Sequence, residues 1–249
     1  MNFLYQVFYL SDTVIQFLLL VLLLRGPFRK YVVFSIYVVG TLAVDVIEAI
    51  AYYRVGWGSP AYRRLYWTDH VTLDLLLFLV VIAFTYAALQ ENPLRPKAAK
   101  SLGVIVVVAL ALPFAMLHIN PNRAHPFFSS QWFNHASQIW NFGAAIMNLV
   151  LWTALLSNRR RDPQLVTLSI GVGIATASAA IAWGARRWLP EGNRWTVDSF
   201  MVVTHLASLL LWCWAFRAKV GSRSSGATPT GSAKPPSNAP SPDALTTPS

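Results

Sequence analysis

Acidic side chains interrupt the apolar stretches of this 249-residue chain. Six of its ten acidic residues fall inside those stretches. A charged side chain near the centre of a bilayer costs at least about 2.5–3.5 kcal/mol on insertion scales, so such residues tend to face a bundle interior and have partners there. Carboxylates in this setting bind cations, relay protons or, together with histidine, ligate metal ions. The six residues are Asp12, Asp45, Glu48, Asp69, Asp74 and Asp198.

The polar residues within the apolar stretches are spaced as on a helix. Residues three, four or seven positions apart lie on one face of an α-helix. Such pairs occur in five stretches, for example Asp12 with Gln16, and we expect five helices to turn polar faces toward one cavity. The candidate lining residues are Asp45, Glu48, His70, Asp74, Gln138, Asn141, Asp198 and His205.

Each of these residues also has a structural interpretation. Arginines at the same helix ends, such as Arg54 and Arg63, can pair with the carboxylates, and Asn or Gln side chains can hydrogen-bond between helices. Asp69 and Asp198 stand near helix starts, where an acid caps free N–H groups and favours the positive end of the helix dipole. The convergence of so many polar groups at one depth favours a shared cavity.

A metal site is a second interpretation of the same residues. His70, Asp74, His135 and His205 are of the types that ligate metal ions. However, no HxxxH or HExxH motif fixes two ligands by spacing. The sequence therefore keeps a metal-dependent, hydrolase-like membrane enzyme as an alternative, and it assigns no metal, no other cofactor and no catalytic residue.

Seven apolar runs carry these residues, and each is about as long as a bilayer is thick. A helix needs roughly 20 apolar residues to cross the hydrocarbon core, whereas a barrel strand needs only about 9–11. Lipid offers the backbone no hydrogen-bond partners, so spanning segments of this length are helices. The sequence predicts an all-α, polytopic bundle of seven transmembrane helices in contact with the lipid bilayer of the cell membrane. The runs are residues 3–24, 31–53, 68–89, 101–119, 132–157, 165–185 and 196–216.

The positive charge of the chain is distributed over helix ends. A net charge of +10 is compatible with nucleic-acid binding, but no single long basic patch occurs, and we expect no nucleic-acid partner. Loops with more Lys and Arg stay in the cytoplasm. Alternate loops, counted with the start of the C-terminal segment, carry twelve of these residues on one side and seven on the other, which predicts an outside N-terminus and a cytoplasmic C-terminus.

The depth of the polar residues favours binding over transport. With this orientation all six acids fall in the outer half of their runs, while the inner half is almost purely apolar. A carrier or channel needs a polar path across the membrane, so a proton- or cation-coupled transporter is a less favoured alternative. We expect an outward-facing polar pocket for sensing or binding a small ligand, with any signal passed to a separate cytoplasmic partner.

Two further regions have distinct compositions. The sixth run contains Gly171 and Gly173, each four residues before an alanine, and small residues at this spacing allow helices to pack closely. Residues 218–249 are rich in Ser, Pro, Ala and Thr, a composition that cannot bury a core. The expected domains are therefore a membrane domain at 1–217 and a disordered cytoplasmic tail at 218–249.

The stretch from Tyr62 to Arg95 carries a resemblance to known proteins. It has a Tyr-Trp pair, Tyr66 and Trp67, before the third run, and a basic loop containing Pro93 after it. In these features the chain resembles an uncharacterised family of small bacterial seven-helix integral membrane proteins. The resemblance implies the same topology and no established activity.

Overall fold

Seven helices make up the described part of the chain. The computed structural model describes residues 3–26, 28–56, 59–90, 95–119, 129–157, 162–188 and 194–224, without the side chains of 3–9, 116–119, 130, 183, 186–187, 194–195, 198 and 218–224. Within these ranges there is no strand, in agreement with the predicted all-α class. The helices are α1 (Phe3–Leu24), α2 (Val32–Val55), α3 (Pro60–Ala88), α4 (Arg95–Ile119), α5 (Ser130–Ser157), α6 (Pro163–Trp188) and α7 (Arg194–Ser224).

Six of these helices, α2 to α7, are long and apolar enough to cross a membrane, which indicates a multi-pass membrane protein. In α1 the segment with described side chains, Leu10–Leu24, is apolar but shorter, so the seventh span stays a prediction. Each predicted run overlaps one helix. One large difference is the start of α3 at Pro60 instead of residue 68. There the Ser59 hydroxyl accepts a hydrogen bond from the Tyr62 N–H (3.0 Å), and proline suits a first helical turn.

The end of α7 also differs from the predicted domain boundary. The helix continues to Ser224, seven residues beyond the predicted end of the membrane domain at residue 217. The rest of the predicted tail, residues 225–249, lies outside the described residues.

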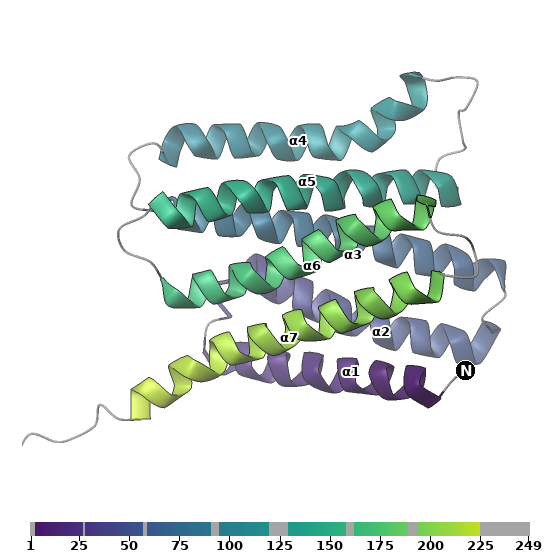
Figure 1. Ribbon diagram of the computed structural model, residues 1–249, viewed down its shortest axis with the longest axis horizontal. Coiled ribbons are helices and arrows are strands. Elements are labelled where there is room, and N and C mark those ends of the chain that lie inside the picture. The colour runs from purple at the N-terminus through teal and green to yellow at the C-terminus, as the bar shows by residue number, and fades with distance from the viewer. Residues whose placement is uncertain are drawn as a thin grey trace, which may run out of the picture.

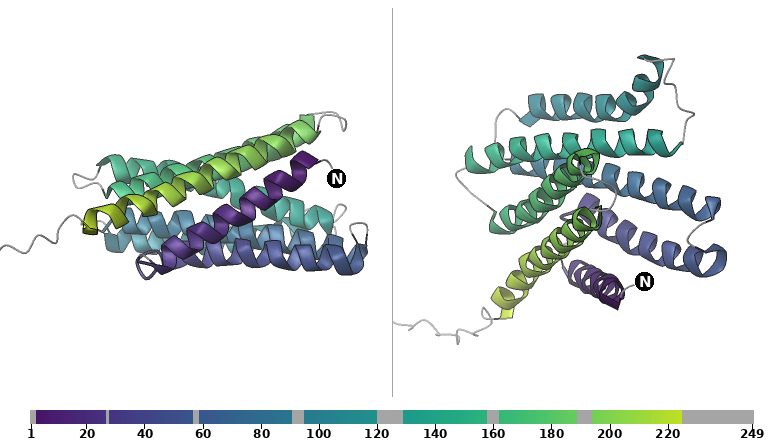
Figure 2. Two further views of the ribbon diagram at one scale, coloured as in Figure 1. Left: turned by 90° about the horizontal axis from the view of Figure 1, so that it is seen from below. Right: turned by 45° about the vertical axis from the view of Figure 1, so that its right-hand side comes forward.

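Six helices form a closed ring, and α4 lies outside it. Each helix of the ring contacts the next in the order α1, α2, α3, α5, α6 and α7, and α7 contacts α1. Among the described residues, α4 contacts only α3 and α5. Figure 1 and the right-hand view of Figure 2 show α4 at the edge of the bundle. We call the end of the bundle where α2 ends and α3 begins the α2–α3 end, and the opposite end the α1–α2 end.

Helix α4 is attached to α5 at its proline. Pro113 lies inside α4 and has no N–H, so it cannot donate to the carbonyl of Ala109 four residues earlier. The indole N–H of Trp140 on α5 donates to that carbonyl instead, at 2.9 Å. Figure 1 shows α4 bent near its C-terminal end, as the proline predicts. One hydrogen bond therefore satisfies the carbonyl that the proline leaves free.

Replacing Trp140 by phenylalanine is expected to cost about 1 kcal/mol of stability. The aromatic ring stays, but the Ala109 carbonyl loses its donor. Hydrogen bonds between membrane helices average about 0.6 kcal/mol, with a maximum near 1.7 kcal/mol. The midpoint of unfolding in SDS measures the change. In a Pro113→Ala background an intrahelical N–H is restored, so there the same substitution should cost close to nothing. Equal costs in both backgrounds would contradict the assignment.

Two glycines of α6 leave space for large side chains from the neighbouring helices α5 and α7. A Cβ added at Gly171 would lie 2.3 Å from Nε1 of Trp212 on α7, and one at Gly173 would lie 2.7 Å from Nδ2 of Asn148 on α5. The Trp212 indole N–H also donates to the carbonyl of Leu168 on α6, at 3.2 Å. The expected close packing of the sixth run therefore occurs at these two glycines.

Aromatic side chains fill the ring toward the α1–α2 end. The Phe34 and Trp212 rings meet edge-to-face with centroids 5.1 Å apart, and the Tyr37 and Trp212 rings do so at 6.0 Å. Such pairs are favourable beyond the area they bury. The side chains come from α3, α7, and α2 with the residue before it, so they join three helices of the ring. We call this cluster the aromatic plug; it consists of Tyr31, Phe34, Tyr37, Phe84, Trp212 and Phe216.

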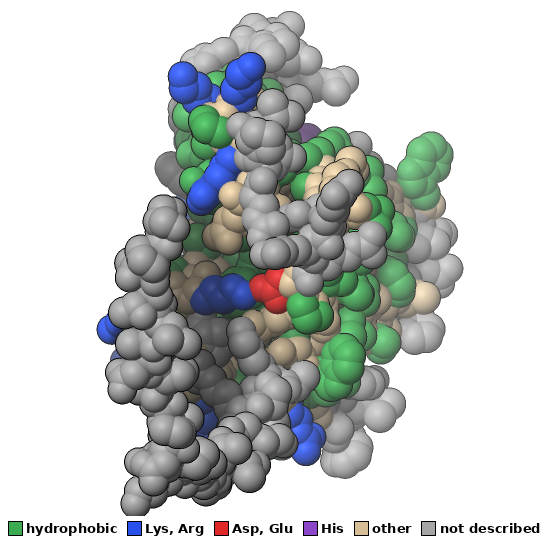
Figure 3. Space-filling view, turned by 90° about the vertical axis from the view of Figure 1, so that its left-hand side faces the viewer, with side chains coloured by type: hydrophobic (Ala, Val, Ile, Leu, Met, Phe, Trp, Pro, Cys, Tyr) green, Lys and Arg blue, Asp and Glu red, His purple; other side chains and the backbone are tan. Residues whose placement is uncertain are grey.

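An ion pair lies at the α1–α2 end beside the plug. The Lys30 ammonium donates to Oδ2 of Asp162 and lies 4.9 Å from the centre of the Tyr31 ring. Burial alone would raise the pKa of Asp162, but the hydrogen bond and charge of Lys30 outweigh it and hold that pKa below its ordinary value. Figure 3 views this end, where Lys and Arg side chains are spread over the face and an acidic side chain lies beside one of them.

Substitution of Asp162 should separate its two roles. Asp162→Asn removes the ion pair and is expected to cost about 0.5 kcal/mol, because both partners are partly exposed. Asp162→Ala also removes the cap on α6, where Oδ1 accepts from the Gln164 N–H at 3.1 Å, and should cost about 1 kcal/mol more.

The pH dependence of unfolding gives the control. A carboxylate with a lowered folded pKa stabilises the protein above its unfolded pKa, and this contribution is lost as the pH falls through the folded value. The difference between wild type and Asp162→Asn should therefore vanish in acid. A difference that does not change with pH would show that the ion pair is not its source.

Candidate functional site

A cavity of about 350 Å³ lies inside the ring of six helices. This volume is in the range of small-molecule sites, roughly 300–1,000 Å³. Every helix of the ring contributes side chains, and α4 contributes none of the lining residues described. The lining residues are Asp12, Gln16, Tyr37, Thr41, Asp45, Glu48, Tyr66, His70, Leu73, Asp74, Leu77, Asn141, Ala175, Ser178, Ala179, Met201, Val202 and His205.

The cavity is closed toward the α1–α2 end and more open toward the α2–α3 end. Along α2, Tyr37 and Thr41 are 5% and 6% exposed, whereas Asp45 and Glu48, one to two turns nearer the α2–α3 end, are half-buried. Tyr37 is also part of the aromatic plug, so the plug forms the floor of the cavity. The exposure of the lining side chains therefore rises from the floor toward one end of the bundle.

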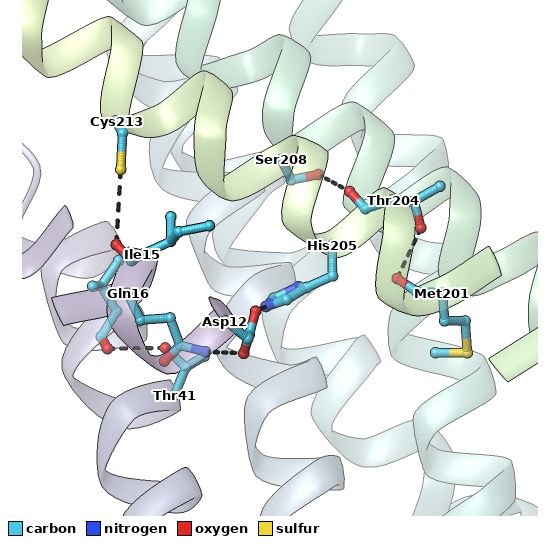
Figure 4. A network of polar contacts seen from close by, with 10 residues as sticks. Asp12, Ile15, Gln16, Thr41, Met201, Thr204, His205, Ser208 and Cys213 are labelled. Atoms are coloured by element: carbon cyan, nitrogen blue, oxygen red, sulfur yellow. Dashed lines mark hydrogen bonds and ion pairs between the residues drawn. The ribbon is translucent and has the colours of Figure 1, made fainter. Parts of the chain in front are cut away.

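A polar network joins α1 to α7 at the cavity wall (Figure 4). The Gln16 amide donates to Oδ2 of Asp12 at 2.6 Å, and Nε2 of His205 lies 3.4 Å from Oδ1 of the same carboxylate. Asp12 and Gln16 are four residues apart on α1, so their side chains are neighbours on one face of the helix. His205 approaches the same carboxylate from α7. The Asp12 carboxylate is therefore positioned by two helices.

A second carboxylate is held between α3 and α5. The Ser137 hydroxyl donates to Oδ2 of Asp74 at 2.5 Å, and the Asn141 amide donates to the backbone carbonyl of Ser137 at 3.0 Å. Ser137 and Asn141 are four residues apart, so they lie on the same face of α5. This arrangement places the carboxylate of Asp74 and the amide of Asn141 side by side on the cavity wall.

The charges around the cavity are mostly of one sign. Four carboxylates line it. The carboxylate of Asp45 is close enough to those of Asp12 and Glu48 for its charge to interact with both. Among the described lining residues there is no Lys or Arg, and the basic side chains are two histidines. The ring of His70 lies against that of Tyr66, with centroids 4.1 Å apart. The site is therefore acidic, with aromatic surface beside the acids.

The structure brings together most of the residues that the sequence singled out. Six of the eight line the cavity. Gln138 is half-buried on α5 but does not line it. The side chain of Asp198 lies outside the described residues. The six lining residues are Asp45, Glu48, His70, Asp74, Asn141 and His205.

Sequence reasoning left two parts of the site out of the candidate list. Asp12 and Gln16 share a helical face that the spacing reveals, so a signal for them exists. The contribution of α6 has a weaker signal, because Ala175, Ser178 and Ala179 belong to the small-residue stretch that also packs helices. Small side chains line a cavity by leaving space, and their pattern is the same as that of a packing helix.

The alternative of a metal site requires histidine side chains that lie close enough together to ligate one ion. His135 is exposed and does not line the cavity, whereas His70 and His205 do. Within the part of the chain that the structure describes, no three His, Cys, Asp or Glu side chains are grouped to hold a metal ion. We therefore find no ligand set among the described residues on which to build a metal-dependent reaction.

No protein-family model matches the chain, and neither does any curated protein or solved structure, so the resemblance to small bacterial seven-helix proteins stays a prediction.

Proposed function

We propose that this protein is a seven-span membrane protein that binds a small ligand in an outward-facing pocket and reports its presence to a cytoplasmic partner. The observation that carries the proposal is a polar cavity of small-molecule size that is open toward one end of the bundle and closed at the other by the aromatic plug. A transporter needs a polar path at both ends.

The charge at the α1–α2 end supports the orientation. Lys and Arg side chains are spread over the α1–α2 end, and loops rich in these residues stay in the cytoplasm. The cavity, which opens toward the other end, then faces outward, with the N-terminus outside and the C-terminus in the cytoplasm. Trp212 and Phe216 of the plug lie on α7, as does His205 of the cavity wall, so one helix connects the pocket to the cytoplasmic end.

Cysteine labelling in intact cells tests the pocket and its orientation. Cys213 is the only cysteine, so a Cys213→Ala chain is a clean background. A membrane-impermeant maleimide should label Tyr66→Cys on the cavity wall but not Lys97→Cys in the first turn of α4, which should react only after the membrane is permeabilised. Ile146→Cys, on the lipid-facing side of α5, is the control and should react in neither case. Labelling of Lys97→Cys alone in intact cells would overturn the orientation.

Native mass spectrometry of the gently purified protein tests occupancy and separates the alternatives. A bound organic mass is expected, and it should be reduced when the cavity is filled by Ala179→Trp. A stoichiometric metal that is lost in His205→Ala would replace the proposal by a metal-dependent site.

A further inference from the structure

The wall of the cavity presents more hydrogen-bond acceptors than donors. Its wall presents the carboxylates of Asp12, Asp45, Glu48 and Asp74 and, among the described lining residues, no Lys or Arg. Ionised carboxylates only accept hydrogen bonds. A ligand that fits this wall brings donors and positive charge with it.

Two buried amides show the same imbalance independently of the acids. Gln16 and Asn141 are each 1% exposed and line the cavity. Within the described part of the chain, the side-chain oxygen of each accepts no hydrogen bond. Their NH₂ groups are already used, by the Asp12 carboxylate and the Ser137 carbonyl. A flipped amide would turn oxygen toward oxygen, so the free atom at each position is an acceptor. A buried acceptor without a donor is unfavourable, and a ligand with a donor would remove that cost.

The rest of the wall suits an organic ligand better than a bare ion. Leu73, Leu77 and Met201 add apolar surface, and the Tyr66 ring lies at the cavity wall beside His70. Aromatic faces attract organic cations. A cavity of about 350 Å³ is also far larger than a metal ion with its first ligands, which lie about 2.0–2.6 Å from it.

We propose that the pocket takes a small organic amine in its protonated form, whose ammonium N–H groups face the carboxylates and the two amide oxygens while its carbon chain lies along the apolar wall. This inference rests on the proposed function and names its ligand class. An anion would meet four carboxylates, and a ligand without donors would leave Gln16 and Asn141 unsatisfied.

Binding to the purified protein in phosphatidylcholine nanodiscs tests the ligand class. The probes are linear mono- and diamines of two to six carbons, with the α,ω-diols and dicarboxylates of matched length as neutral and anionic counterparts. At least one amine should raise the unfolding temperature in a saturable way, and the diols and dicarboxylates should not. The bis(trimethylammonium) analogue of the best diamine, which has no N–H donors, should bind at least tenfold more weakly.

Variants locate the site. Asp74→Asn and Gln16→Met should each weaken the amine at least tenfold. Asp162→Asn is the control, because Asp162 is a half-buried acid at the α1–α2 end that pairs with Lys30 and does not line the cavity, and it should leave the affinity unchanged. The unfolding temperature of each variant without amine shows that it is folded. An equal effect of all three variants would overturn the site.

The remaining outcomes separate this inference from the proposed function. If a diol or dicarboxylate binds in the pocket and no amine does, the amine is wrong and the pocket stands. The same conclusion follows if nothing in the panel binds while Tyr66→Cys is still labelled from outside. If nothing binds and the cysteine is not labelled, both proposals fail. A divalent metal ion that binds stoichiometrically and displaces the amine would overturn the ligand class.

Discussion

Replacing Trp212 by alanine is expected to lower the free energy of unfolding by about 3 kcal/mol, the largest effect of any single substitution considered. The side chain is 0% exposed, and it packs edge-to-face on Phe34 with centroids 5.1 Å apart. Truncating a buried Trp costs about 3–5 kcal/mol in soluble proteins. The lower end applies here because lipid is as apolar as the core, so the loss is one of packing and of the hydrogen bond to Leu168.

The matched control for Trp212 lies two residues along the same helix. Trp214 is 62% exposed and faces away from the ring, so Trp214→Ala should change stability by less than about 0.5 kcal/mol. SDS titration of both variants, followed by far-UV circular dichroism, gives the comparison. Equal losses at the two positions would mean that the aromatic plug does not hold α2, α3 and α7 together.

The helices of this fold follow directly from the sequence, but their arrangement does not. A bilayer requires long apolar helices, so the seven runs predict seven helices at nearly the observed positions. The position of α4 outside the ring has no such signal, because lipid-facing and helix-facing surfaces are equally apolar in a membrane. Pro113 is the visible clue to the attachment of α4, and the identity of its partner, Trp140, depends on which helix lies beside it.

The candidate site was partly predictable for a related reason. Charged residues are costly in lipid, so Asp45, Glu48 and Asp74 were expected to face inward. His70 lies four residues before Asp74, so helical spacing places it on the same face of α3. Spacing identifies a face only broadly. Gln138 and Asn141 are three residues apart, yet only Asn141 reaches the cavity. The ring of six helices decides which part of a polar face meets the cavity, and no local pattern encodes that ring.

Replacing Gly171 by alanine is expected to cost about 1–3 kcal/mol, the cost of an overpacked core. The new Cβ would lie 2.3 Å from Nε1 and 2.7 Å from Cδ1 of Trp212, and the indole has little room to move because it packs against Phe34 and Tyr37. The control is Gly103 on α4, where no described atom lies within 4 Å of an added Cβ. Gly103→Ala should be neutral or stabilise by up to about 1 kcal/mol, since alanine favours the helix.

A double substitution decides whether Gly171 acts through Trp212. In a Trp212→Ala chain the space occupied by the indole is empty, so adding Gly171→Ala should cost little and should recover part of the lost packing. The two substitutions should therefore be non-additive by at least about 1 kcal/mol, as expected for residues in direct contact. Additive losses would show that Gly171 matters for the backbone of α6 and not as the seat of Trp212. The close approach of α6 would then have to be explained by Gly173 and its contact with Asn148.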